Sequence, residues 1–249
     1  MLRTRLAAFL LALSFCATAV LRADDPPAQP EPQPPMNSAI TPVPRDGGWI
    51  KRHEKINERA KQGDVDLLFI GDSITEGWEG AGKDVWQQHY GNRKAMNLGI
   101  GGDRTQHVLW RLDNGNIEGL HPKLAVIMIG TNNSNREDNT ADEISEGIKA
   151  IVAKLRERLP EMKILLLGVF PRSEKHNPQR EKISRFNELA RQVADGQAVS
   201  YLDIKEEFVN DDGSISKEIM PDYLHLSPQG YEIWASSIED KVAELLGEK

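Results

Sequence analysis

The sequence Val65-Asp66-Leu67-Leu68-Phe69-Ile70-Gly71-Asp72-Ser73 decides the fold of this chain. Four apolar residues in succession, Leu67 to Ile70, predict a strand that is buried on both faces of a parallel sheet. Gly71 permits a sharp turn, and Asp72 or Ser73 can cap a helix that follows. Such a turn places Ser73 at the carboxyl edge of the sheet, where α/β folds bind their ligands. Ser73 is therefore either a nucleophile or only a helix cap, and this stretch alone leaves both readings open.

Short apolar runs and longer amphipathic segments alternate along the rest of the chain. The former predict buried strands, and the latter predict helices with one apolar face. Their alternation predicts one α/β domain with a doubly wound, five-stranded parallel sheet and helices on both faces. Five strands are too few for the eight-stranded α/β barrel. Strands are predicted at 65–70, 95–100, 124–129, 163–169 and 199–204, and helices at 49–62, 84–90, 105–112, 141–159, 179–194 and 227–246.

The composition is that of a globular, acidic protein. The chain has 249 residues, of which 39% are hydrophobic and 28% are charged, and its formal net charge is -7. This hydrophobic content is enough for a packed core. Nucleic acids and anionic membranes are bound through clustered Lys and Arg, so the acidic balance argues against both as partners.

Residues 1–23 have the layout of a secretory signal peptide, with Arg3 and Arg5 ahead of an apolar run at 6–21, and Ala23 before the cut. A membrane anchor is an alternative, but the run is short and interrupted for a span. Lipidation at Cys16 is another, although the bulky Phe15 before it fits poorly. We expect cleavage and export to the periplasm or the exterior. Cys16 is the only cysteine, so the mature chain would have no disulfide in an oxidising compartment.

Residues 24–47 are rich in Pro, Gln and Glu, and their last proline is Pro44. This composition predicts an extended, mostly unfolded tether, although a proline-rich ligand for a partner domain has the same signature. The folded domain is therefore expected to begin at residue 48 and to run to residue 249.

The first three predicted strands all lead into Gly followed by small polar residues. In a parallel sheet these ends share one edge. Acyl transfer needs a nucleophilic oxygen there, with hydrogen-bond donors placed where the oxyanion will form. Ser73 can be the nucleophile, and the backbone amides of Ser73 and Gly102 and the side-chain amide of Asn132 can be the donors. The alternative is that these residues only shape turns after strands.

A nucleophilic serine also needs a base that is oriented by a third group. Asp222 and His225 stand three residues apart just ahead of the last predicted helix. In a turn, this spacing lets the carboxylate reach a ring nitrogen of the histidine. His225 would then take the proton of Ser73 and later return it to the leaving alcohol. The alternative is a histidine that forms only local hydrogen bonds at the start of the helix.

Ser73 in Gly-Asp-Ser, Gly102, Asn132 and the pair Asp222 and His225 resemble, in this order, the four sequence blocks of the GDSL/SGNH hydrolase superfamily. A narrower likeness is to the catalytic subunits of type Ib platelet-activating factor acetylhydrolases. It runs from about residue 42 to the last helix. The segments that carry it are 97–112, 130–133, 171–175 and 222–226.

This resemblance implies a flavodoxin-like SGNH fold and a Ser-His-Asp triad that uses no metal and no cofactor. It also implies that Ile74, Thr131 and Leu224 border a small acyl pocket, because those positions do so in the acetylhydrolases. Two segments beside the site, 75–80 and 227–229, differ from those subunits, which are also cytosolic. The alcohol part of the substrate, an acetylated sugar or a lipid, therefore stays open.

From these features we expect a secreted serine esterase that hydrolyses short acyl, above all acetyl, esters. A lysophospholipase or thioesterase of the same fold would need a longer groove than Ile74 and Leu224 suggest. A non-catalytic glycan-binding module would be expected to lack a catalytic residue, and none is missing. A nucleotide-binding protein of flavodoxin type would need a GxxxxGK(S/T) phosphate-binding loop, which the sequence lacks, and no Lys stands beside the Gly71 turn. The sequence leaves open whether the protein is a homodimer.

Overall fold

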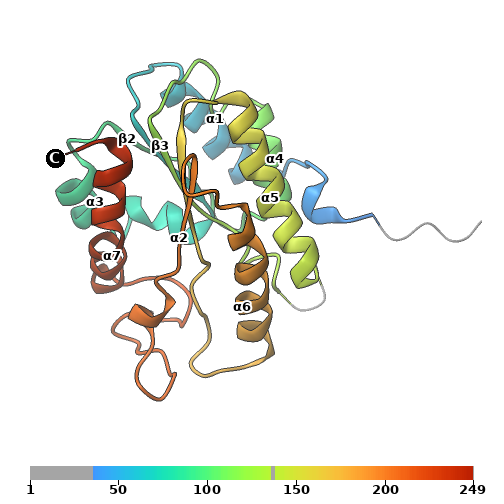
Figure 1. The fold of residues 1–249 in the computed structure, drawn as a ribbon, viewed down its shortest axis with the longest axis vertical. Coiled ribbons are helices and arrows are strands. Elements are labelled where there is room, and N and C mark those ends of the chain that lie inside the picture. Colours follow the sequence, from blue (N-terminus) through green and yellow to red (C-terminus); the bar gives the residue numbers. More distant parts are fainter. Residues whose placement is uncertain (1–35, 136–137, 249) are drawn as a thin grey trace, which may run out of the picture. The chain divides into compact units, whose positions relative to one another are not determined.

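The computed structural model describes residues 36–135 and 138–248. Within them, five strands form one all-parallel sheet with the order β2-β1-β3-β4-β5 (Figure 1). This is the strand order of the flavodoxin-like doubly wound fold, so the predicted fold class is confirmed. The strands are β1 (Leu67–Gly71), β2 (Ala95–Asn97), β3 (Leu124–Met128), β4 (Lys163–Leu167) and β5 (Val199–Leu202).

Helices cover both faces of this sheet. In Figure 1, α3 and α7 lie together on one side, and α4, α5 and α6 lie on the other. No helix in the described part of the chain is long and apolar enough to cross a membrane. The helices are α1 (Gly48–Ala60), α2 (Ser73–Glu76), α3 (Lys83–Tyr90), α4 (Thr105–Asp113), α5 (Ala141–Arg158), α6 (Pro178–Ala190) and α7 (Pro228–Leu246), with short 3-10 turns η1 (Ser38–Ile40), η2 (Gly77–Glu79), η3 (Arg191–Val193) and η4 (Lys205–Phe208).

Aromatic side chains fill the layer between the sheet and the helices α3 and α7. Phe69 on β1 packs against Trp86 and Tyr90 of α3, with ring centroids 5.0 and 4.8 Å apart. Trp234 of α7 lies 5.0 Å from Trp78 of η2. Each such pair contributes roughly 0.5–1.5 kcal/mol beyond the burial of its area. The cluster therefore fixes β1, whose carboxyl end leads to the candidate nucleophile.

Four of the five strands end earlier than predicted, and beyond two of them, β2 and β4, asparagine side chains bond to the backbone. The side chain of Asn97 at the end of β2 accepts from the N–H of Gly99 at 2.8 Å and donates to the carbonyl of Thr75 at 2.9 Å. Asn187 of α6 bonds to both the N–H and the carbonyl of Val169, at 2.9 and 3.0 Å, just after β4. These backbone groups therefore pair with side chains instead of a neighbouring strand.

The described part of the expected tether, residues 36–47, differs from the prediction because it packs on the domain. The compact unit begins at Met36 rather than at residue 48. Ala39 in η1 is fully buried, and its carbonyl accepts a hydrogen bond from Oγ1 of Thr105 at 2.8 Å. Gly147 makes room for this contact, since a Cβ there would lie 2.8 Å from the same carbonyl. Residues 24–35 and the predicted signal peptide at 1–23 lie outside the described residues.

Candidate active site

The first strand ends two residues before Ser73, which therefore lies at the carboxyl edge of the sheet. β1 is buried along its whole length, and it turns at Gly71, where a Cβ would lie 2.5 Å from the carbonyl oxygen of Met128. Asp72 then caps α2, because its Oδ1 accepts a hydrogen bond from the N–H of Ile74 at 3.0 Å. Ser73 is the first residue of α2 and is half-buried. Capping thus falls to Asp72, and the hydroxyl of Ser73 is left for another role.

Asp222 and His225 lie beside Ser73 in the loop ahead of α7. Nε2 of His225 is 2.9 Å from Oγ of Ser73, and Nδ1 is 2.6 Å from Oδ2 of Asp222. An ionised carboxylate can only accept, so the ring proton lies on Nδ1, and Nε2 is free to accept the proton of Ser73. The three residues predicted as a triad therefore lie in one hydrogen-bonded row.

The loop that carries His225 is held by hydrogen bonds and by its backbone shape. Burial would raise the pKa of Asp222, but hydrogen bonds from the ring and the N–H of His225 outweigh it and leave that pKa below its ordinary value. Asp222 is therefore ionised at neutral pH. Tyr223 has a φ of +59°, a left-handed conformation that turns the chain between the two residues. Its carbonyl accepts from the N–H of Ser173 at 2.8 Å, which ties this loop to the one after β4.

The second loop brings Gly102 and its neighbours alongside Ser73. A Cβ on Gly101 would lie 3.8 Å from the Cβ of Ser73, so this backbone borders the candidate nucleophile. Gly102 has a φ of +76°, which favours glycine. The half-buried side chain of Asn132 donates one N–H to the carbonyl of Asp103 at 2.9 Å. Its amide group has a second N–H, which remains for an oxyanion.

A buried ion pair holds this loop against α4, and the sequence interpretation did not single it out. Asp103 and Arg111 are both fully buried, with Nε of Arg111 2.8 Å from Oδ2 of Asp103. Oδ1 of Asp103 accepts from the indole N–H of Trp49 at 2.6 Å. Burial raises the pKa of Asp103, and Arg111 opposes that rise. The only signal in the sequence was that both residues fall within the block 97–112.

The three residues expected at the acyl pocket differ in exposure. Ile74 and Thr131 are each about 1% exposed, whereas Leu224 is half-buried beside His225. Arg172, in the loop after β4, places Nη1 3.4 Å from Oγ1 of Thr131 and 3.0 Å from Oδ1 of Asn135. A guanidinium therefore lies next to Thr131, one of the residues expected to border the acyl pocket. Within the described residues, no three carboxylate, imidazole or thiol groups lie together as a metal site would require.

A family model described as "GDSL-like Lipase/Acylhydrolase family" matches residues 69–233, which include the strand, the loops and the histidine described above. The chain belongs to the GDSL-like lipase/acylhydrolase family. As a member of an acylhydrolase family, it is a carboxylic ester hydrolase.

Relatives in this family agree with the narrower resemblance. The alpha1 subunit of platelet-activating factor acetylhydrolase IB from Bos taurus is 38% identical over 224 residues, 90% of this chain and 91% of its own. The alpha2 subunit from Rattus norvegicus is 40% identical over 204 residues, 82% of this chain and 87% of its own. The predicted kinship with these subunits is therefore confirmed.

Solved structures share the fold. A GDSL-like lipase from Bacteroides thetaiotaomicron matches with a TM-score of 0.63 and 22% identity, over 78% of this chain and 97% of that one. An acetylxylan esterase from Geobacillus stearothermophilus matches with a TM-score of 0.58 and 21% identity, over 75% of this chain and 96% of that one. At these identities the likeness concerns the fold alone.

Proposed function

We propose that this chain is an exported serine esterase that removes short acyl groups, above all acetyl, through Ser73, His225 and Asp222. The observation that carries the proposal is the hydrogen-bonded row from Oγ of Ser73 through His225 to Asp222, at 2.9 and 2.6 Å. Such a row both activates a serine and holds the base in the correct tautomer. Export is proposed from the layout of residues 1–23.

The proposed reaction runs in two steps on these residues. Oγ of Ser73 attacks the ester carbonyl while Nε2 of His225 takes the hydroxyl proton, and Asp222 stabilises the imidazolium. The N–H groups of Ser73 and Gly102 and the free N–H of Asn132 hold the oxyanion. The intermediate expels the alcohol, which takes the proton from His225. A water, activated by the same histidine, then hydrolyses the acyl enzyme and frees the acid.

Preference for short acyl groups is supported by the residues proposed to border the acyl group. Ile74 and Thr131 are buried and β-branched, so their χ1 angles are stiff and they do not readily swing aside. The relatives from Bos taurus and Rattus norvegicus are also named as acetylhydrolases, enzymes that remove acetyl groups. An acetylated sugar and an acetylated lipid both satisfy this proposal.

The test combines a nucleophile variant with a substrate panel. Ser73→Ala should abolish hydrolysis of nitrophenyl acetate, and a fluorophosphonate probe should label Ser73 in the parent protein. Thermal unfolding of the variant should match the parent, because Ser73 is not part of the apolar core. Acetylated sugars and an acetylated ether phospholipid are then compared for kcat/KM. Full activity in Ser73→Ala would refute the proposed role of Ser73.

A further inference from the structure

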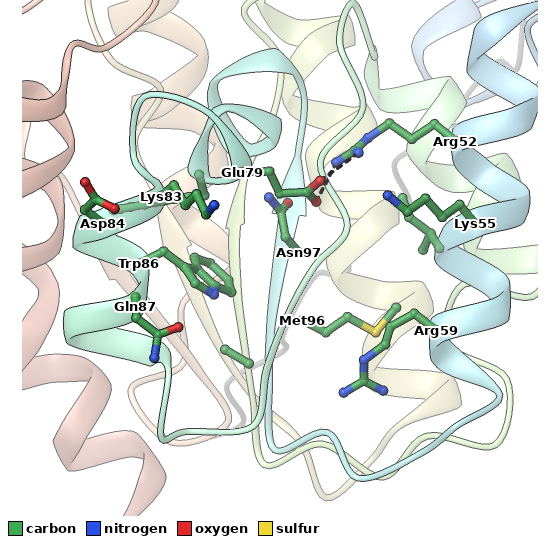
Figure 2. A pocket seen from close by; sticks show the side chains of 13 residues that line it. Arg52, Lys55, Arg59, Glu79, Lys83, Asp84, Trp86, Gln87, Met96 and Asn97 are labelled. Atoms are coloured by element: carbon green, nitrogen blue, oxygen red, sulfur yellow. Dashed lines mark hydrogen bonds and ion pairs between the residues drawn. The ribbon is translucent and has the colours of Figure 1, made fainter.

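A hollow lies apart from the candidate active site, at the edge of the sheet beside β2. Its volume is about 540 Å³, and its walls come from α1, η2, α3 and β2. Ile56, Trp78 and Met96 form buried, apolar parts of its lining, and the half-buried Trp86 faces it from α3 (Figure 2). A concave site with apolar walls and a few polar groups is the usual form of a small-molecule site.

The charged groups around this hollow are mainly cations. Arg52, Lys55 and Arg59 follow one another at intervals of three and four along α1 and so share one face of it. Lys83 comes from the opposite wall. Figure 2 shows the side chains of Lys55 and Lys83 reaching toward the hollow from its two sides, while Asp84 points away from it. This positive lining belongs to a chain whose formal net charge is -7.

The two lysines differ from Arg52 in their pairing. Arg52 makes a two-point contact with Glu79, at 2.9 and 3.1 Å, and a further ion pair with Glu76 at 3.2 Å. Among the described residues, neither Lys55 nor Lys83 has a carboxylate partner within 4 Å. Two ammonium groups that face one hollow without a counter-charge favour a bound anion.

We propose that this hollow binds a small amphiphilic anion, with its apolar body against Trp86 and Met96 and its charged group between Lys55 and Lys83. A carboxylate, sulfonate or phosphate group satisfies both ammonium groups, and an aryl or alkyl body fills the apolar part. A fully polar anion would leave uncovered the apolar surfaces of Trp86 and Met96 that line the hollow.

Arg52 connects this site to the loop at the candidate active site. Its Nε donates to the carbonyl of Gly99 at 2.8 Å. Glu76, its ion-pair partner, accepts from the N–H of Gly101 at 2.5 Å. A bound anion competes with Glu76 and Glu79 for Arg52, and so it loosens the backbone that carries the proposed oxyanion donor. This coupling rests on the proposed function, and its expected effect is a lower kcat.

Binding is tested with 8-anilinonaphthalene-1-sulfonate, an aryl sulfonate whose fluorescence rises in apolar sites. The probe is titrated into the full chain carrying Ser73→Ala, so that binding is read without any catalysis. It should bind saturably, and adding Lys55→Gln and Lys83→Gln should raise its Kd at least about tenfold. Lys51→Gln with Lys149→Gln is the matched control. It makes the same change of charge outside the hollow and should leave the Kd within about twofold.

Coupling is tested by the hydrolysis of nitrophenyl acetate. Saturating probe should lower kcat of the parent severalfold, whereas Lys55→Gln with Lys83→Gln should keep the basal kcat and resist the probe. An unchanged kcat in the parent at saturation would refute the coupling. The Kd measurement does not depend on the proposed function. A parent that hydrolyses no ester would refute that function, but the Kd of the probe could still be measured.

Three results would overturn the site itself. The first is an equal Kd in the double variant and its control. The second is loss of probe binding after Ser73 of the parent is labelled by a fluorophosphonate, which would place the probe at the nucleophile. The third is loss of probe binding as a dimer forms at higher protein concentration. That result would make the hollow an interface between two copies of the chain.

Discussion

Asp72 is a buried carboxyl group directly before the candidate nucleophile Ser73. It is about 1% exposed, and burial raises its pKa from 3.8 to about 7, although the hydrogen bond from the N–H of Ile74 opposes the rise. A carboxyl whose pKa is higher in the folded state binds its proton more tightly there. Its stabilising effect is therefore present below pH 3.8 and is lost as the pH rises to about 7.

Asp72→Asn should change this pH dependence. The amide keeps an oxygen for the N–H of Ile74 and cannot ionise. The free energy of unfolding of Asp72→Asn should therefore exceed that of the parent. The difference should grow from pH 5 to pH 8, toward an upper value of about 4 kcal/mol. Urea unfolding at both pH values measures it, with the exposed Asp46→Asn as control. A difference that stays constant with pH would show that Asp72 ionises equally easily in both states.

Leu224 is the half-buried residue among the three proposed for the acyl pocket. If Ile74 and Thr131 are rigid walls, each methylene that does not fit lowers kcat/KM, whereas in an open groove each buried methylene would add about 0.8 kcal/mol. The parent should therefore prefer acetate or propionate in a series up to octanoate. Leu224→Ala should move the optimum to longer chains. Faster hydrolysis of octanoate than of acetate by the parent would favour the lysophospholipase or thioesterase alternative.

At the scale of elements, the ion pair between Asp103 and Arg111 joins α4 to the loop after β2. Arg111 also donates from Nη1 to Oδ1 of Asn116 at 2.5 Å and from Nη2 to the carbonyl of Gly71 at 3.4 Å. One buried guanidinium therefore links the helix, the loop with Gly102 and the turn before Ser73. Removing one partner of a buried pair leaves the other charge without compensation.

Arg111→Met should lower the free energy of unfolding by about 3–5 kcal/mol, because it leaves the carboxylate of Asp103 buried and unpaired. Adding Asp103→Asn should restore part of that loss, since the uncompensated charge is then gone. Urea unfolding of the parent, both single variants and the double variant gives the coupling between them. Equal stability of Arg111→Met and the double variant would mean that the charge of Asp103 is compensated by other groups.

At the scale of the molecule, the segment ahead of α1 belongs to the folded unit. η1 packs against α4 and α5, and Arg45 donates to the carbonyl of Gly101 at 2.7 Å. The guanidinium of Arg45 also lies 3.0 Å from where a Cβ on Gly102 would be. The segment therefore covers one side of the loop at the candidate active site.

Two truncations test the boundary. A chain that begins at Met36 should unfold at the same temperature as the full chain, because the compact unit starts there. A chain that begins at Gly48 should be less stable by a few kcal/mol, since it loses the burial of Ala39 and the hydrogen bonds of Arg45. Thermal unfolding and nitrophenyl acetate hydrolysis measure both. Equal stability of the two chains would show that the segment contributes nothing to the fold.

The α/β class, the order of strands and helices, and the residues at the carboxyl edge were all readable from the amino-acid pattern. Buried parallel strands are continuous apolar runs, and a run such as 67–70 is readable without knowing its neighbours. Asp222 and His225 were also readable, because they are three residues apart and meet in a local turn. The family blocks then joined this pair to Ser73 across more than one hundred positions.

The contacts between residues of separate elements became visible only in the folded chain. The domain boundary at Met36, the pair of Asp103 and Arg111, and the place of Arg172 beside Thr131 all depend on contacts between separate elements. Charged residues in a sequence look alike whether they face water or a buried partner. The local pattern cannot tell the two apart, because the free energy that separates them comes from burial, and burial exists only once the chain has folded.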